Sequence, residues 1–273
     1  MIDWLQTLPN IELGILIMSI GISISTVLPI LVRHHFKLDY NNESLAKGAE
    51  EGFKLVTTLT LLLLAFCLVR AQEDHRNVED LVAREATIIY KLNTALGSFG
   101  TPEAAALQNK TRLYAESTVN DEWPLLAKGG RSGKVSALLE DLSAGCHQLM
   151  PQTRSQQFAQ SEVLTTLAQM SGVREARLSA SHLSLPIYYW QAISAAIMLL
   201  CVVGWIQHPL SKLAIYVGGI VLGISLILTL LIVTDGIFTG QNRVTPIAIE
   251  RIVPLLGSAA KQGVQDKSSP APA

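Results

Sequence analysis

Charged residues are scarce in this chain. Only 16% of its 273 residues are Asp, Glu, Lys or Arg, whereas 49% are hydrophobic. The mean hydropathy is positive. This balance is unusual for a soluble domain and typical of a membrane protein with a sizeable aqueous part. The formal net charge of −1 also lacks the basic excess of nucleic-acid binders. We therefore expect a protein that resides in a lipid bilayer and binds no nucleic acid.

Cysteine is scarce too, and its placement excludes two kinds of site. The three cysteines, Cys67, Cys146 and Cys201, lie far apart, and two of them fall in apolar runs. Cys146 then has no aqueous partner, so we expect neither a disulfide framework nor a cysteine-based metal site. The six histidines form no His-x-x-x-His pair with an acidic residue. No metal ligand set is therefore indicated.

Catalytic motifs are missing as well. Residues 128–134 superficially resemble a phosphate-binding loop, but no glycine stands five residues before Gly133, and Val135 occupies the position that needs Ser or Thr. No Gly-x-Ser-x-Gly elbow occurs. We find no catalytic constellation, and we therefore expect no enzyme activity and no cofactor.

Four apolar runs are long enough to cross a bilayer as helices. We place these spans at about residues 13–32, 52–69, 187–206 and 213–234. No alternating strand pattern of useful length occurs. The predicted fold is therefore all-α, with four transmembrane helices and a large helical aqueous insertion between spans two and three. Small residues four apart in spans one and four are typical of helix-packing faces. They are Ser19, Ser23, Gly219 and Gly223.

The predicted spans divide the chain into four parts. Residues 1–70 hold spans one and two, residues 71–186 form the helical aqueous domain, and residues 187–240 hold spans three and four. Residues 241–273 form a C-terminal tail with a short interfacial helix at residues 245–256. We expect this tail to be partly disordered, because its end is polar and rich in Pro and Ser.

Two helix starts in the aqueous domain have clear sequence signals. Thr101 precedes Pro102, a proline suited to the first helical position. Residues 153–156 form a capping-box pattern, in which Thr153 and Gln156 can each bond to the backbone of the other.

The second span organises the chain, because one helical rod from Gly52 to about Leu96 leaves the membrane and continues in water. A polar stripe follows one side of this span. It comprises Lys54, Thr57, Thr58, Leu61 and Ala65. Such a stripe often faces a bundle interior or a water pathway, so these residues are pore-lining candidates. The structural alternative is that Lys54 pairs with Glu50 or Glu51 and that the threonines bond their own helix backbone.

A second candidate site is ionic. Glu85 falls on the apolar seam of the predicted helix, next to Arg84, and a carboxylate buried there needs a partner. Arg174 and Arg177, three residues apart on the last helix of the aqueous domain, are the predicted partners. We favour a structural ion network among these four residues over an ion-binding site.

The charge distribution predicts which side of the membrane each loop occupies. The short loop after span one carries Arg33, His34, His35 and Lys37, whereas the N-terminal tail has no Lys or Arg. The positive-inside rule therefore places this loop in the cytoplasm. With four spans, the N-terminus, the large helical loop and the C-terminus then lie outside.

Seven short motifs, in order around the four spans, carry a family resemblance. They are Glu51-Gly52-Phe53, Leu64-Ala65-Phe66, Arg84-Glu85-Ala86, Glu122-Trp123-Pro124, Arg174-x-x-Arg177-Leu178, Pro186-x-x-x-Trp190 and Phe238-Thr239-Gly240. Together they cover most of residues 42–246. The chain resembles the bacterial bestrophin-like membrane proteins, a group of unknown function. The resemblance implies a multi-pass protein of the bacterial inner (plasma) membrane.

The resemblance also implies a function. Bestrophins are pentameric anion channels whose second span lines the pore. A similar protein would be a homo-oligomer that conducts chloride or another small anion, with Lys54, Thr57, Thr58 and Leu61 facing the conduit. This sequence departs from bestrophins in having no run of acidic residues like their calcium clasp. The alternative is a membrane-anchored binding or sensory protein, whose helical loop recognises a partner or ligand and whose spans only anchor it.

Overall fold

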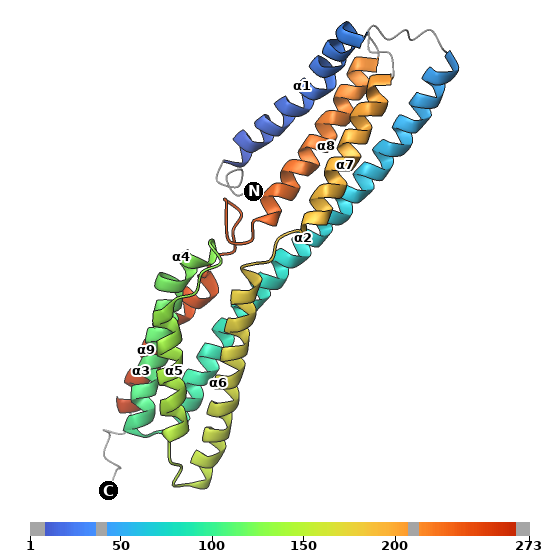
Figure 1. The fold of residues 1–273 in the computed structure, drawn as a ribbon. Coiled ribbons are helices and arrows are strands. Elements are labelled where there is room, and N and C mark those ends of the chain that lie inside the picture. The colour runs from blue at the N-terminus through green and yellow to red at the C-terminus, as the bar shows by residue number, and fades with distance from the viewer. Residues whose placement is uncertain (1–8, 37–42, 207–212, 266–273) are drawn as a thin grey trace. The chain divides into compact units, whose positions relative to one another are not determined.

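The computed structural model of the chain describes residues 9–36, 43–206 and 213–265, and every regular element in these ranges is a helix. The expectation of an all-α fold is therefore confirmed for this part of the chain. The longest element is α2 (Glu43–Phe99), one continuous helix of 57 residues. The described residues separate into two compact units, each with its own core (Figure 1).

The first unit comprises Met1–His75 and Ser184–Arg243. Its helices are α1 (Asn10–Phe36), the N-terminal part of α2, α7 (Ile187–Ile206) and α8 (Leu213–Asp235). Buried apolar side chains of α2, α7 and α8 form one core cluster. Its members include Phe53, Leu64, Cys67, Ile193, Leu200, Ile224 and Leu231. Apolar packing among helices is therefore what holds this unit together.

Helix α1 packs along α8 at positions without a side chain. A methyl group added at Gly21 would lie 2.8 Å from Ser225 Oγ, and one added at Gly14 would lie 3.6 Å from Thr229 Cγ2. The predicted helix-packing residues lie elsewhere: Ser19, Ser23 and Gly219 are exposed and Gly223 is half-buried. Methyl groups added at the two α8 glycines would meet no atom within 4 Å among the described residues. Within one chain, α1 and α8 therefore approach each other at Gly14 and Gly21 of α1.

The two helices α7 and α8 are joined by a polar contact. The Leu185 backbone N–H donates to Asp235 Oδ1 at 2.7 Å. Because Leu185 stands just before α7 and Asp235 ends α8, the carboxylate ties the start of one helix to the end of the other. It also places a carboxylate near the N-terminus of α7, where an anionic group is favourable.

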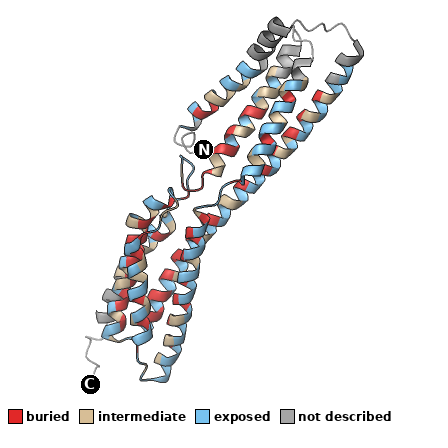
Figure 2. Ribbon diagram, in the orientation of Figure 1, coloured by how far each residue is buried: buried red, intermediate tan, exposed pale blue. Residues whose placement is uncertain are grey.

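Among the described residues, two stretches of helix are long and apolar enough to cross a membrane: Glu50–Phe99, which includes the second predicted span, and Gly218–Asp235 in α8. The described parts of the first and third predicted spans contain shorter apolar helices, Ile11–Ile24 and Ile187–Val203. Many large apolar side chains of the first unit are exposed, including Phe66 at 66% and Met198 at 68% (Figure 2). This composition indicates that the chain associates with a membrane.

The second unit comprises Arg76–Leu183 and Val244–Ala273. Besides the C-terminal part of α2, its helices are α3 (Pro102–Ser117), the π-helix η2 (Thr118–Glu122), α4 (Trp123–Leu126), α5 (Gly133–Gln148), α6 (Arg154–Ala180) and α9 (Ile247–Gln265). Every major helix contributes to its apolar core. The fully buried members include Val78, Ile89, Leu92, Leu96, Leu142, Val163, Met170 and Ile249.

The predicted helix starts in this unit are confirmed. Thr101 Oγ1 accepts from the Ala104 backbone N–H at 3.3 Å, with Pro102 at the first helical position. Thr153 and Gln156 form the complete capping box at the start of α6. The Gln156 amide also donates to the Phe99 carbonyl at 3.1 Å. The cap of α6 therefore holds the end of α2 as well.

Residues of the predicted C-terminal tail contribute a helix to the second unit. Helix α9 packs on α3 and runs on to Gln265, beyond the short interfacial helix that we expected at residues 245–256. Its Ile249 and Leu256 side chains are almost fully buried. These residues stand seven apart and so share one helix face, which gives α9 an apolar stripe that α3 covers. Residues 266–273, the end of the tail, lie outside the described residues, so their disorder stays a prediction.

The contact of α5 with α3 depends on Gly145. A methyl group added there would overlap Leu107 Cδ2, whereas one added at Gly172 in α6 would meet no atom within 4 Å among the described residues. We expect Gly145→Leu to destabilise the second unit by about 1–3 kcal/mol through overpacking. Gly172→Leu, which also replaces a helix-interior glycine, should cause no loss. Denaturant unfolding followed by circular dichroism measures both, and equal effects would contradict this packing.

Candidate functional site

The core of the second unit contains a charged cluster that begins at Glu85. This residue stands on the apolar seam of α2 between Val82 and Ile89, and its side chain is fully buried. The Arg177 guanidinium of α6 holds it in a two-point contact, with Nε 2.6 Å from Oε2 and Nη2 3.2 Å from Oε1. The paired geometry fixes the angle as well as the distance between the two side chains.

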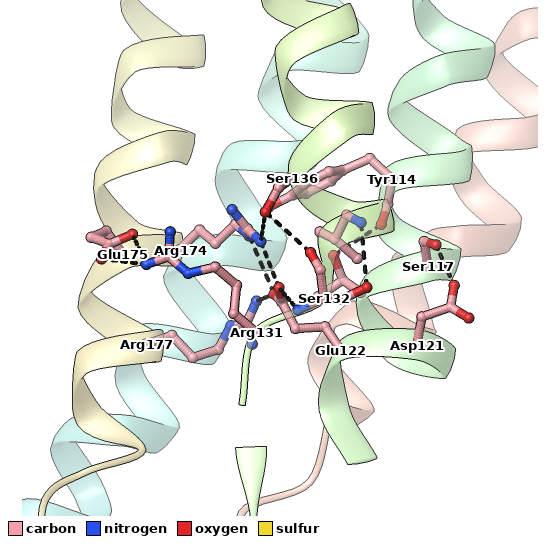
Figure 3. Close-up of polar contacts among 12 residues, drawn as sticks. Tyr114, Ser117, Asp121, Glu122, Arg131, Ser132, Ser136, Arg174, Glu175 and Arg177 are labelled. Carbon is pink, nitrogen blue, oxygen red and sulfur yellow. Dashed lines mark hydrogen bonds and ion pairs between the residues drawn. The ribbon is translucent and has the colours of Figure 1, made fainter. Parts of the chain in front are cut away.

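Glu122 is the centre of the cluster, and its side chain is also fully buried. Arg174 donates to Oε1 through Nη2 at 2.6 Å and to Oε2 through Nε at 3.2 Å, and Arg177 Nη2 donates to Oε2 at 2.8 Å (Figure 3). The Ser132 backbone N–H donates to Oε1 at 3.3 Å. Both carboxylate oxygens are therefore fully engaged by the protein, which leaves Glu122 little capacity to bind a further ligand.

The position of Glu122 follows from an irregular helix. Residues Thr118–Glu122 form a π-helix, in which the Trp123 backbone N–H bonds to the Thr118 carbonyl. Pro124 follows directly and has no N–H to continue the ordinary α-helical ladder. The wider turn adds a residue and changes the direction in which Glu122 points. Glu122 thereby faces α6.

Three further side chains complete the cluster. The Tyr114 hydroxyl of α3 donates to Glu85 Oε1 at 3.4 Å, and Arg174 Nη2 donates to Ser136 Oγ of α5 at 3.1 Å. The Trp123 ring centroid lies 5.3 Å from the guanidinium carbon of Arg177, within cation–π range. The cluster therefore joins α2, α3, η2, α4, α5 and α6.

The charges in the cluster balance one another. Two carboxylates face two guanidinium groups, so the cluster is neutral as a whole. Burial opposes the charged form of Glu122, but the hydrogen bonds and charges of Arg174 and Arg177 outweigh it and lower the pKa of this carboxyl. Burial, and then the Glu85 charge, raise the pKa of Tyr114. Burial opposes ionisation of Arg177 too, yet Glu85 and Glu122 raise its pKa.

This arrangement is suited to holding helices together. A general acid or base needs a pKa near the working pH, and the pKa values of Glu122, Tyr114 and Arg177 are shifted away from it. Elsewhere, burial raises the pKa of the Cys146 thiol to about 11, which keeps it protonated and unreactive. Among the described residues, no group of three His, Cys, Asp or Glu side chains could hold a metal ion.

The structure brings together three of the four residues predicted for the ion network. Glu85, Arg174 and Arg177 meet in the cluster, whereas Arg84 is exposed on α2. Glu122 was absent from the predicted network, although it links the two arginines. Its signal in the sequence was the Glu122-Trp123-Pro124 motif, which carried the family resemblance but gave no spatial information.

The polar stripe of α2 in the first unit is divided between two faces. Lys54 and Thr58 are exposed, as is Ala65, while Leu61 is half-buried. Thr57 is buried, and its hydroxyl has no hydrogen-bond partner among the described residues. The predicted pore-lining candidates therefore do not share one surface within a single chain.

The exposed members of the stripe make local contacts. Lys54 Nζ lies 2.9 Å from Glu50 Oε1 and 3.4 Å from Glu51 Oε1. The Thr58 hydroxyl donates to the Lys54 carbonyl at 2.9 Å. These contacts are the ones expected if Lys54 pairs with nearby glutamates and the threonines bond to their own helix backbone. The Lys54 and Thr58 side chains nevertheless remain exposed.

The cluster can be tested by a double-mutant cycle. Glu85→Ala leaves one excess positive charge and Arg177→Ala one excess negative charge, and each should cost about 3–5 kcal/mol of unfolding free energy. The double variant retains the balanced Arg174–Glu122 pair, so its cost should fall short of the sum by about 1–3 kcal/mol. The exposed Arg131–Glu175 pair, at 2.8 Å, is the control and should be additive with small effects. If the costs of Glu85→Ala and Arg177→Ala simply add in the double variant, the two side chains are not energetically coupled and the predicted interaction is contradicted.

The lowered pKa of Glu122 predicts acid sensitivity. Because the folded-state pKa lies below the ordinary value of 4.5, the stabilisation is complete above that pH and is lost as the pH falls through the folded pKa. We expect the unfolding midpoint to fall on acidification below about pH 4.5 and Glu122→Gln to weaken this dependence. Glu140→Gln, at an exposed position on α5, is the control. Parallel pH profiles for wild type and Glu122→Gln would exclude this contribution.

Comparison with known proteins identifies the family. The family model described as the bestrophin-like domain matches residues 23–249, which include the described parts of α2, α7 and α8 as well as the ion cluster. No curated protein and no solved structure matches the chain. Since the family model covers most of the sequence, this protein belongs to the bestrophin-like domain family.

Proposed function

We propose that this protein is a homo-oligomeric channel for chloride or another small anion, with α1, α2, α7 and α8 as its four transmembrane helices. Family membership supports the proposal, as do the apolar stretches of these helices. The observation that carries it is a face of α2 that the other described residues leave uncovered.

One face of α2 in the first unit is buried and the opposite face is open. Phe53, Leu64 and Cys67 point into the core cluster. The opposite face exposes Lys54, Thr58 and Ala65, flanked by apolar side chains. The exposed apolar neighbours are Leu55, Leu59, Leu62, Phe66 and Val69. On this face the polar groups need water, and the apolar groups need lipid or another protein surface. The described part of a single chain supplies neither.

A ring of identical chains would supply that environment. An ammonium or hydroxyl group facing lipid is costly, whereas the same group lining a water-filled conduit is solvated. In a closed oligomer, the Lys54–Thr58–Ala65 side of α2 would face the conduit, and the apolar side would contact a neighbouring chain or lipid. Lys54 then stands near one end of the predicted span, next to Glu50 and Glu51.

We further propose a multi-pass inner-membrane location with the N-terminus and the large helical loop outside. The support is the run of basic residues after span one, which the positive-inside rule assigns to the cytoplasm. Protease treatment of spheroplasts, in which the outer face of the inner membrane is accessible, checks this assignment with an epitope in the loop, since a protected epitope would reverse it.

The channel proposal is tested with purified protein in liposomes loaded with a chloride-sensitive dye. We expect chloride influx from wild type and a several-fold lower chloride-to-sodium permeability ratio in Lys54→Glu, because the reversed charge repels anions. Lys91→Glu is the matched control, since it reverses an exposed lysine of the same helix in the second unit. A sealed preparation of the intact oligomer without halide flux would reject the channel. It would favour a membrane-anchored binding protein instead.

A further inference from the structure

A buried polar group outside the ion cluster has no partner among the described residues. Asn93 of α2 is fully buried, and neither its Nδ2 nor its Oδ1 forms a hydrogen bond with any of them. Its neighbours on the helix seam are Ile89, Leu92 and Leu96, which are also fully buried and apolar. Nearly all buried side-chain amides in folded proteins are hydrogen-bonded, so this carboxamide indicates a bound group.

A polar side chain from α3 contacts the Asn93 backbone and not its side chain. Gln108 of α3 donates through Nε2 to the Asn93 backbone carbonyl at 2.8 Å. The same Nε2 would lie only 2.9 Å from a methyl group added at Gly97, one turn further along α2. The Gln108 amide thus lies against the α2 backbone, and among the described residues the Asn93 side chain has no hydrogen bond.

Other polar residues occupy the same level of the unit. The Glu85–Arg177 and Phe99–Gln156 contacts set an antiparallel register between α2 and α6. This register places Asn93 near the level of Thr166, which is buried on α6. Together with Gln108, three helices therefore bring a polar residue to one layer of the core, next to the apolar side chains of Ile89, Leu92 and Leu96.

The chemistry of this layer restricts what it can bind. The group must accept from Nδ2 and donate to Oδ1, and it must be small because the surrounding side chains are packed. It must also be neutral, since Asn93, Gln108 and Thr166 carry no charge that could balance a buried ion. Water meets all three requirements, and internal waters typically make about three hydrogen bonds to buried polar groups.

We propose that Asn93 holds an ordered internal water molecule between α2, α3 and α6. This site is separate from the ion cluster and independent of the proposed channel function. The water satisfies a carboxamide that the described residues leave unpaired, and it links the three helices at a level where apolar packing is interrupted.

The test is water-to-amide NMR transfer in the full chain, with asparagine side chains labelled with ¹⁵N. We expect a cross-peak between water and the Asn93 side-chain amide with the sign of a long-lived bound molecule. Exposed Asn77, on the same helix, is the matched control and should show only the signature of rapidly exchanging solvent. Asn93→Leu serves only to assign the Asn93 side-chain amide peak, which it removes. Cross-peaks from the Asn93 amide to protein protons alone, without water, would overturn the proposal.

Discussion

The second unit depends on one neutral ion cluster enclosed in its core. Moving a carboxylate or a guanidinium out of water costs several kcal/mol, and only close pairing with good geometry offsets that cost. Glu85 and Glu122 meet this condition because Arg174 and Arg177 stand one turn apart on α6 and reach both carboxylates. The helices that carry these side chains are therefore restricted to an arrangement that keeps all four charges paired.

Several local features of the second unit serve this arrangement. The π-helix directs Glu122 towards α6, and Ser132 contributes a backbone N–H to Glu122 while capping α5 with its side chain. Trp123 lies against Arg177 and donates through Nε1 to the Val244 carbonyl at 3.4 Å. The segment leading into α9 is thereby connected to the cluster. A change at one of these positions affects the cluster through geometry as well as through charge.

The first unit is stabilised by different physics. Its core is apolar, and many of its outward-facing side chains are apolar too. In a lipid bilayer the hydrophobic effect, which folds the second unit in water, does not drive the burial of these outer faces. Shape complementarity, such as the approach of α1 to α8 at Gly21, replaces it. The open face of α2 is the exception, because it combines Lys54 and Thr58 with leucines. This mixture motivates the proposal of an oligomer around a conduit.

Much of the organisation could be predicted from local patterns. The helical periodicity, the caps at Thr101 and Thr153 and the placement of Glu85 on an apolar seam are properties of neighbouring residues, and local physics determines them. The resemblance to the family also rested on short motifs. The involvement of Glu122 could not be predicted in this way, because it requires a π-helical turn and a contact between residues 52 to 55 positions apart.

The sequence by itself determined the all-α fold, the family and the need of Glu85 for a cationic partner, because each follows from composition, periodicity, short motifs or the cost of a buried charge. Only the tertiary structure decided that Glu122 completes the cluster, that Thr57 is buried while Lys54 is exposed, and that α9 packs on α3. These outcomes depend on which helix faces meet. Packing between distant segments sets those faces, and no local pattern encodes it.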